Sequence, residues 1–144
     1  MFDRFGRVSF CPHTKVAGFV SHLEEGRLVA SRCIGCSLMS FPPRADCPDC
    51  RCGEFDFTEL SGRGTVSTFT RIAAAPAGFE ASAPYTIGVV DLEETGRLLA
   101  CFGESINETE VTIGMAVQVV PRRLDAKGET RIDYTLERPV TGRA

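Results

Sequence analysis

The chain has 144 residues, of which 43% are hydrophobic and 24% are charged, and its formal net charge is −3. These values are typical of a globular protein with one domain, or with one small domain and a metal module. The sequence also excludes a bilayer-spanning helix, because no apolar run reaches about 20 residues. The excess of 19 acidic over 16 basic residues disfavours a nucleic-acid-binding protein.

The first 13 residues form an arm without clear periodicity. Its apolar side chains are Phe2, Phe5, Val8 and Phe10. Such an arm cannot bury much surface on its own, so we expect it to pack on a metal module or to bind another protein. The start of the chain has no apolar stretch behind a basic end, so we expect no signal peptide. Together with free thiols, this predicts a cytoplasmic location.

Residues 14–26 are predicted to form a helix. Four apolar residues with i, i+3, i+4, i+7 spacing would share one face: Val16, Phe19, Val20 and Leu23. Thr14 is a suitable N-cap, and Gly26 is suited to the left-handed conformation that ends many helices. A helix this short needs a partner surface to be stable.

Four cysteines form the most informative motif of the chain. They make two C-x-x-C pairs, Cys33 with Cys36 and Cys47 with Cys50. Each pair can place two thiolates on one ion, and two pairs complete a tetrahedral shell. Such a shell leaves no open coordination position, so we predict a structural Zn²⁺. Residues 27–60 would form the zinc ribbon, with strands at 28–32 and 37–41 around the first pair.

Other uses of these cysteines fit less well. Two disulfides require an oxidising compartment, and the total of seven cysteines is odd. A redox-active C-x-x-C is expected once, at the start of a helix. A rubredoxin-type iron site uses the same spacing and stays open as an alternative. Cys52 could replace Cys50 as a ligand, although a nearby free thiol is the simpler interpretation.

After Gly53 the sequence alternates with period two in successive short segments. Strands are predicted at residues 54–60, 65–72, 85–92, 97–102, 116–120 and 131–137. Short antiparallel strands with almost no helix favour a small barrel over residues 61–144, of OB type first and of SH3-like type second. The predicted fold class is therefore mainly β. An N-terminal arm and helix over residues 1–26 would precede a zinc ribbon and a C-terminal OB-type antiparallel barrel.

Residues 73–84 join two predicted strands through a long loop. A loop of this length in a compact barrel is more often functional than filler. Phe79 is its one aromatic residue. Two interpretations of Phe79 have equal weight: it touches a ligand or partner, or it folds back over the end of the barrel.

The chain offers no convincing catalytic constellation. His13 and His22 are its two histidines. Cys11-Pro12-His13 brings a thiol close to an imidazole in sequence, but the rigid proline between them opposes nucleophile–base geometry. Cys101 lies in an apolar strand and resembles a small buried hydrophobe. Residues 61–64 lack the following helix that a phosphate-binding loop needs. No reaction can be assigned to the chain alone.

The order of these motifs resembles the acyl-CoA-associated zinc-ribbon/OB-fold family, which is found beside thiolase-like proteins. The resemblance covers about residues 15–137. Its specific pieces are Pro42-Pro43-Arg44 between the cysteine pairs and Ser61-Gly62-Arg63-Gly64-Thr65-Val66 after them. It implies a rubredoxin-like zinc ribbon, an OB barrel, and a non-catalytic subunit that docks a catalytic subunit and helps to enclose the acyl-CoA path. The arm, with Phe5-Gly6 and Val8-Ser9-Phe10, is most similar to small thiolase subunits of anaerobic aromatic degradation, as in toluene breakdown.

A binding and scaffolding subunit of a thiolase-type acyl-CoA complex is thus the predicted function, with a thiolase-like catalytic subunit as partner in a hetero-oligomer. Coenzyme A carries phosphates, so arginines near loops are candidate ligand residues, with one aromatic beside them: Arg44, Arg63, Arg71 and Phe79. A single-stranded nucleic-acid-binding protein is an alternative, but it would need exposed aromatics and a basic groove. An autonomous CoA-ester hydrolase or transferase is a third, for which the sequence shows no nucleophile–base pair.

Overall fold

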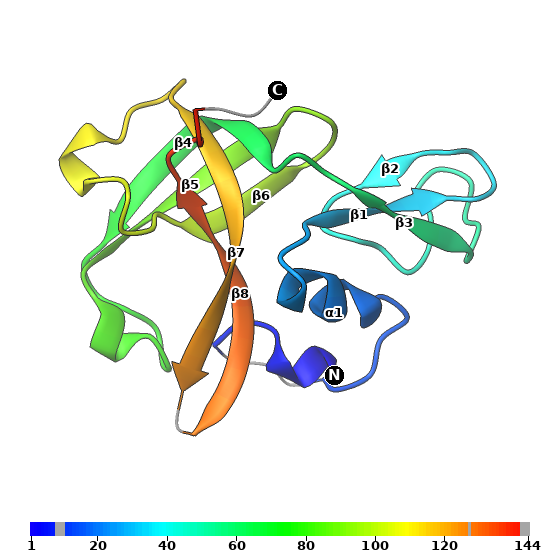
Figure 1. Ribbon diagram of the computed structural model, residues 1–144, viewed down its shortest axis with the longest axis horizontal. Helices are drawn as coiled ribbons and strands as arrows, with labels where there is room; N and C mark the ends of the chain where they lie inside the picture. Colours follow the sequence, from blue (N-terminus) through cyan, green and yellow to red (C-terminus); the bar gives the residue numbers. More distant parts are fainter. Residues whose placement is uncertain (8–10, 127, 142–144) are drawn as a thin grey trace.

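The computed structural model describes residues 1–7, 11–126 and 128–141 and places a small sheet beside a larger barrel (Figure 1). Val8, Ser9 and Phe10 of the predicted arm lie outside the described residues. Three short 3-10 turns accompany the longer elements: η1 (Phe2–Arg4), η2 (Glu80–Ser82) and η3 (Glu108–Glu110). No helix among the described residues is both long enough and apolar enough to cross a membrane.

Helix α1 (Gly18–Glu24) is shorter at its start than the pattern predicts. The backbone N–H of Ala17 donates to the carbonyl of Thr14 at 3.1 Å, an i to i−3 bond of 3-10 type. The segment before Gly18 is therefore a series of tight turns. The C-terminal end agrees with the prediction, because Gly26 has a φ of +79° and closes a Schellman motif with the residue after it.

A three-stranded antiparallel sheet and its connections hold the cysteine pairs. Its strands are β1 (Val29–Cys33), β2 (Met39–Ser40) and β3 (Phe55–Glu59), in the order β2-β1-β3. Strand β1 pairs along its whole length with β3, from Val29 opposite Glu59 to Cys33 opposite Phe55. The second cysteine pair lies in the connection between β2 and β3. The pairing therefore brings the two ends of the metal-binding segment together.

Five antiparallel strands form the second sheet, and it closes into a barrel. They are β4 (Arg63–Ile72), β5 (Tyr85–Leu92), β6 (Arg97–Cys101), β7 (Ala116–Ala126) and β8 (Glu129–Glu137), in the order β6-β5-β4-β7-β8. An isolated parallel bridge joins Phe102 to Leu136, and the N–H of Gly103 donates to the carbonyl of Leu136 at 2.8 Å. The third strand of the barrel thus meets the fifth in parallel. This closed Greek key is the OB arrangement, as predicted.

One continuous core joins helix, ribbon and barrel. The apolar face of α1 is buried, with Phe19 3%, Val20 0% and Leu23 1% exposed. It packs against ribbon and barrel residues of the same cluster, among them Phe41 and Leu136. The partner surface that the short helix needs is therefore supplied by its own chain.

The described part of the N-terminal arm also packs on its own chain. The ring of Phe5 lies 5.6 Å from Phe19 of α1 and 5.9 Å from Tyr134 of β8, measured between centroids. Phe5 bridges Ile132 of β8 in parallel, and the N–H of Gly6 donates to the carbonyl of Ile132 at 2.8 Å. We expected the arm to pack on the metal module or to bind another protein. Residues 1–7 instead pack against helix α1 and strand β8.

Only three residues, 60–62, connect the ribbon to the barrel (Figure 1). Gly62 has a φ of +75°, and a Cβ at this position would lie 2.8 Å from the carbonyl oxygen of Val119. The hairpin turn between β5 and β6 contacts the ribbon, where the hydroxyl of Thr95 donates to the carbonyl of Met39 at 3.1 Å. The two modules are therefore held in one orientation.

Candidate metal centre

Four thiols converge at the end of the ribbon. The Sγ atoms of the two C-x-x-C pairs lie within 4.8 Å of one another. Two contacts across the pairs, Cys33 to Cys50 and Cys36 to Cys47, are 3.5 Å. In a tetrahedral site with Zn–S bonds of about 2.3 Å, neighbouring sulfurs are about 3.8 Å apart. The four cysteines are therefore positioned to bind one metal ion with little rearrangement.

Both cysteine pairs are built on the same backbone turn. After the first pair, the N–H of Ser37 donates to the carbonyl of Cys33 at 2.9 Å. After the second, the N–H of Arg51 donates to the carbonyl of Cys47 at 3.1 Å. Ser37 and Arg51 have φ angles of +64° and +63°, a region that non-glycine residues rarely adopt. The sequence gives no glycine at these positions, so the two left-handed residues escape a sequence pattern search.

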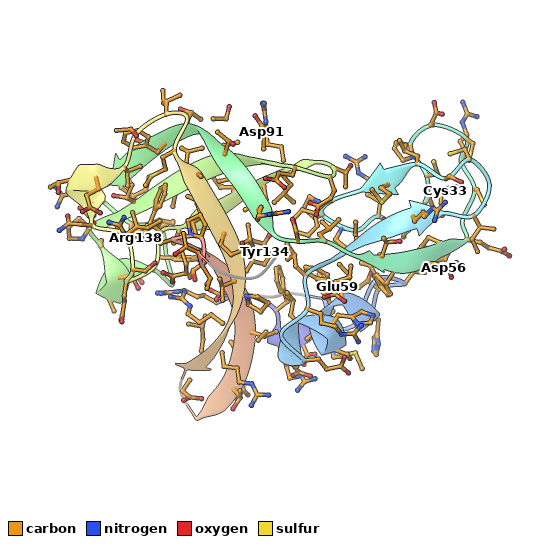
Figure 2. The ribbon with its side chains drawn as sticks, turned by 45° about the horizontal axis from the view of Figure 1, so that its top comes forward. Cys33, Asp56, Glu59, Asp91, Tyr134 and Arg138 are labelled. Carbon is orange, nitrogen blue, oxygen red and sulfur yellow. The ribbon has the colours of Figure 1, made fainter. Side chains whose placement is uncertain are left out.

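The electrostatic setting favours a thiolate at Cys47. The backbone N–H of Cys50 is the largest influence, and it lowers the pKa of the Cys47 thiol to about 7. Cys33 and Cys47 are buried, whereas Cys36 and Cys50 are exposed. Figure 2 shows Cys33 in the ribbon, away from Tyr134 at the barrel. The centre thus lies near the surface, and a closed thiolate shell there would hold the ribbon together without offering a site for substrate.

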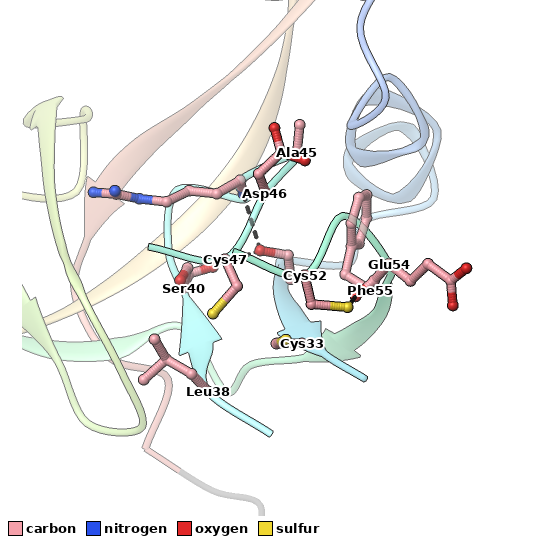
Figure 3. Close-up of a pocket in the computed structure, with 11 residues that line it drawn as sticks. Cys33, Leu38, Ser40, Ala45, Asp46, Cys47, Cys52, Glu54 and Phe55 are labelled. Carbon is pink, nitrogen blue, oxygen red and sulfur yellow. Dashed lines mark hydrogen bonds between the residues drawn. The ribbon is translucent and has the colours of Figure 1, made fainter. Parts of the chain in front are cut away.

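Cys52 lies near Cys33 and Cys47 (Figure 3), but it is outside the set of four thiols that converges. Its thiol donates to the carbonyl of Glu54 at 3.7 Å, and its own carbonyl accepts from the N–H of Cys47 at 2.9 Å. A Cβ at Gly35 would lie 3.2 Å from the Cβ of Cys52 and 3.3 Å from the Sγ of Cys50. Cys52 therefore supports the turn of the second cysteine pair through its backbone carbonyl, and its thiol is not part of the metal-binding set.

Two of the arginines predicted as ligand residues, Arg63 and Arg71, are not brought together. Arg63 and Arg71 begin and nearly end β4, so eight residues of extended chain hold them about 25 Å apart. Arg63 is 61% exposed and paired with Glu93 at 3.2 Å, and Arg71 is 62% exposed and paired with Glu108 at 3.5 Å. The third, Arg44, is exposed on the ribbon. Arg63 and Arg71 are therefore too far apart to meet the same phosphate group.

Phe79 folds back on the barrel end. Its ring lies 6.3 Å from that of Tyr85, the first residue of β5, and the Arg7 guanidinium stands 5.5 Å above it. Arg7 also donates to the hydroxyl of Ser82 in the same loop. The loop over residues 73–84 is thus tied to the N-terminal arm, a link that sequence spacing gave no sign of.

The histidines and the remaining thiols are not arranged as a nucleophile and base. The Cys11 thiol donates to the backbone carbonyl of His13 at 3.0 Å, not to its imidazole. The His22 ring packs edge-on against Phe57 at 5.0 Å, and its Nδ1 has no hydrogen-bond partner among the described residues. Burial raises the pKa of Cys101, which favours its neutral thiol.

Comparison with known proteins matches both modules. Residues 20–57 match the family described as ChsH2, rubredoxin-like zinc ribbon domain, and residues 57–122 match ChsH2, C-terminal OB-fold domain. A DUF35 domain-containing scaffold protein of Methanocaldococcus jannaschii is 40% identical over 114 residues, which are 75% of this chain and 77% of the relative. Benzoylsuccinyl-CoA thiolase subunit BbsA of Thauera aromatica is 36% identical over 69 residues, 48% of this chain and 46% of the relative.

The fold also matches a solved structure. A chain of the Ltp2-ChsH2(DUF35) aldolase superposes with a TM-score of 0.68 and 26% sequence identity. The match covers 88% of this chain and 98% of the other. The order of ribbon and barrel is therefore shared over nearly the whole of that chain.

Proposed function

Because the chain belongs to the DUF35 family, with its zinc ribbon followed by an OB-fold domain, we propose that it is a non-catalytic scaffold subunit of a thiolase-type acyl-CoA complex. In this role, the four cysteines Cys33, Cys36, Cys47 and Cys50 hold a structural Zn²⁺ that keeps the ribbon folded. The chain docks a catalytic subunit and helps to form the path of the acyl-CoA substrate.

The match to the Ltp2-ChsH2(DUF35) aldolase is the observation that carries this proposal. The match covers nearly the whole of that chain, and the name of the structure describes an aldolase that joins Ltp2 to a DUF35 chain. The name of BbsA likewise describes a subunit of a thiolase. A scaffold role transferred from these relatives also agrees with a metal shell that is closed to substrate.

We infer that the turn at the first cysteine pair takes part in docking. Ile34 is 57% exposed and Leu38 is 41% exposed, and they stand on either side of Cys36 in one turn. Two large apolar side chains on a metal-stiffened turn resemble the anchor residues of protein interfaces, which lose little conformational freedom when they bind. We infer contact with the catalytic subunit here, because the described apolar residues of the arm, Phe2 and Phe5, pack against the core of their own chain.

The acyl group is proposed from the likeness to BbsA. An aromatic acyl-CoA, as in anaerobic toluene degradation, is the substrate class that this relative suggests. We expect contact with the CoA phosphates through one of Arg44, Arg63 and Arg71, of which Arg63 and Arg71 lie too far apart to share a phosphate group. Replacing each by Ala in the assembled complex tests the point: the proposal expects one variant to raise the Michaelis constant for the CoA substrate. Three unchanged constants would rule out direct phosphate contact by these residues.

Copurification from the native cell tests the scaffold role itself. We expect one thiolase-sized partner in equimolar yield, and no turnover of acyl-CoA esters by the chain alone. In coexpression, Ile34→Asp should weaken assembly while the zinc content stays at one per chain. Ile113→Asp is the matched control, because Ile113 is 69% exposed and belongs to the loop before β7, outside the ribbon segment. A monomeric chain that converts an acyl-CoA unaided would refute the proposal.

A further inference from the structure

A pocket of about 210 Å³ lies between the N-terminal arm, the 73–84 loop and the barrel. Four separate parts of the fold contribute to it: the arm, the loop, strand β6, and the paired strands β7 and β8. Its principal lining residues are Phe5, Arg7, Phe79, Leu99, Cys101 and Tyr134. The pocket does not include any metal ligand or any of the arginines discussed for CoA.

The walls of this pocket are mainly apolar. Three aromatic rings line it, from Phe5, Phe79 and Tyr134. Leu99 adds an aliphatic side chain that is 59% exposed, an unusual exposure for a leucine next to aromatic rings. An apolar cavity of about 150 Å³ is known to hold a benzene molecule. The pocket is therefore large enough for one small organic molecule with a ring or a short chain.

The charges at the pocket leave one positive group without a carboxylate. Arg122 and Asp133 also line it, but they neutralise each other through two contacts of 3.1 Å, Nε to Oδ1 and Nη2 to Oδ2. Arg7 donates to the neutral hydroxyl of Ser82 and stands over the Phe79 ring. Among the described residues, no carboxylate pairs with Arg7. A guanidinium held in this way is suited to a planar anion.

We propose that this pocket binds a small organic monoanion: a carboxylate on Arg7 with an aliphatic or aromatic body against Phe79, Leu99 and Tyr134. The guanidinium sets the charge of the ligand, and the apolar walls set its body. The proposal stands apart from the scaffold role, because every group that it uses belongs to the single chain.

Binding of benzoate and hexanoate to the zinc-loaded full chain tests this assignment, by calorimetry or by ligand-observed NMR. We expect saturable binding of both carboxylates, and much weaker binding of the neutral benzamide. Inorganic phosphate, which has no apolar body, should not displace benzoate. Arg7→Gln should weaken benzoate binding about tenfold, the scale of a lost charge-assisted hydrogen bond, and leave benzamide unchanged. Leu99→Asp should weaken both carboxylates by adding a negative charge to the wall.

Arg27→Gln is the matched control, since Arg27 is exposed after α1, paired with Glu25 and outside the pocket. It should leave benzoate binding unaltered, and all variants should keep the zinc content and melting temperature of the parent chain. Absence of saturable binding, or equal affinity for benzoate and benzamide, would overturn the proposal, as would equal losses in Arg7→Gln and Arg27→Gln. If no probe binds but Arg7→Gln weakens the assembled complex, the pocket receives an acidic side chain of a protein partner and the small-molecule assignment is wrong.

Discussion

Replacing Phe5 by Ala should destabilise the isolated chain. The Phe5 ring contacts Phe2, Phe19 and Tyr134 at centroid distances of 5.6, 5.6 and 5.9 Å, and so joins the arm to α1 and β8. Full removal of a buried phenylalanine costs about 3–5 kcal/mol. Since Phe5 is only partly buried, we expect a loss of about 2–3 kcal/mol. In a domain of this size, that lowers the melting temperature by about 5–10 °C.

Thermal and urea unfolding of the zinc-loaded monomer measure this loss. Ile113→Ala is the control, since a residue that is 69% exposed should cost less than about 0.5 kcal/mol. The zinc content should stay unchanged in both variants, because Phe5 lies on the barrel side of the core. The reasoning is refuted if Phe5→Ala melts like Ile113→Ala but weakens the complex with a catalytic subunit. In that case the arm would belong to the interface.

Three further predictions concern the metal, the backbone and pH. Replacing any one ligand by Ser should release zinc and unfold the ribbon, because structural zinc contributes roughly 10 kcal/mol or more to such modules, whereas Cys52→Ser should keep the metal in elemental analysis. Ser37→Gly and Arg51→Gly should each raise the unfolding free energy by up to about 1 kcal/mol, because a left-handed φ strains residues that have a Cβ. Burial raises the pKa of Tyr134 to about 12, so its neutral phenol is favoured in the folded chain. The pKa shift of Tyr134 contributes to the free energy of unfolding in full below pH 10, near the unfolded pKa, and this contribution is lost as the pH rises towards 12. At pH 11 the free energy of unfolding should be lower by about 1 kcal/mol, and this decrease should be absent in Tyr134→Phe.

The metal ligands and most strands could be predicted because their signals are local. The C-x-x-C spacing depends only on what two thiolates need to reach one ion. Strand β5 is found at residues 85–92, as its flanking turns predict. Helix α1 begins later than predicted, because a Thr at residue 14 can stabilise a tight turn as well as a helix.

Strand β7 shows where tertiary context overrides a local rule. The prediction ended this strand at residue 120, before a proline, but the strand continues to residue 126. The N–H of Val119 donates toward β4, to the carbonyl of Gly62, so the nitrogen of Pro121 faces the same side. The pairing of β4 with β7 reaches only Gln118 on that strand. Pro121 therefore has no ladder bond to lose, and this cannot be read from the sequence.

The pocket and the arm escaped prediction for the same reason. Phe5 and Tyr134 are 129 positions apart, and the pairing of the arm with β8 makes them neighbours. Arg7 and Ser82 meet across the barrel edge in the same way. The sequence shows which residues are apolar and which are charged, but it does not show which of them lie side by side in the fold.

The three-residue joint between ribbon and barrel affects the thermodynamics of assembly. Domains on flexible linkers lose rotational freedom when a partner fixes both of them, and that loss opposes association. Here Gly62 fits against Val119, and Thr95 is bonded to Met39, so the relative orientation is set before any partner arrives. A catalytic subunit that binds the ribbon therefore also fixes the orientation of the barrel, without a further loss of rotational entropy between the two modules.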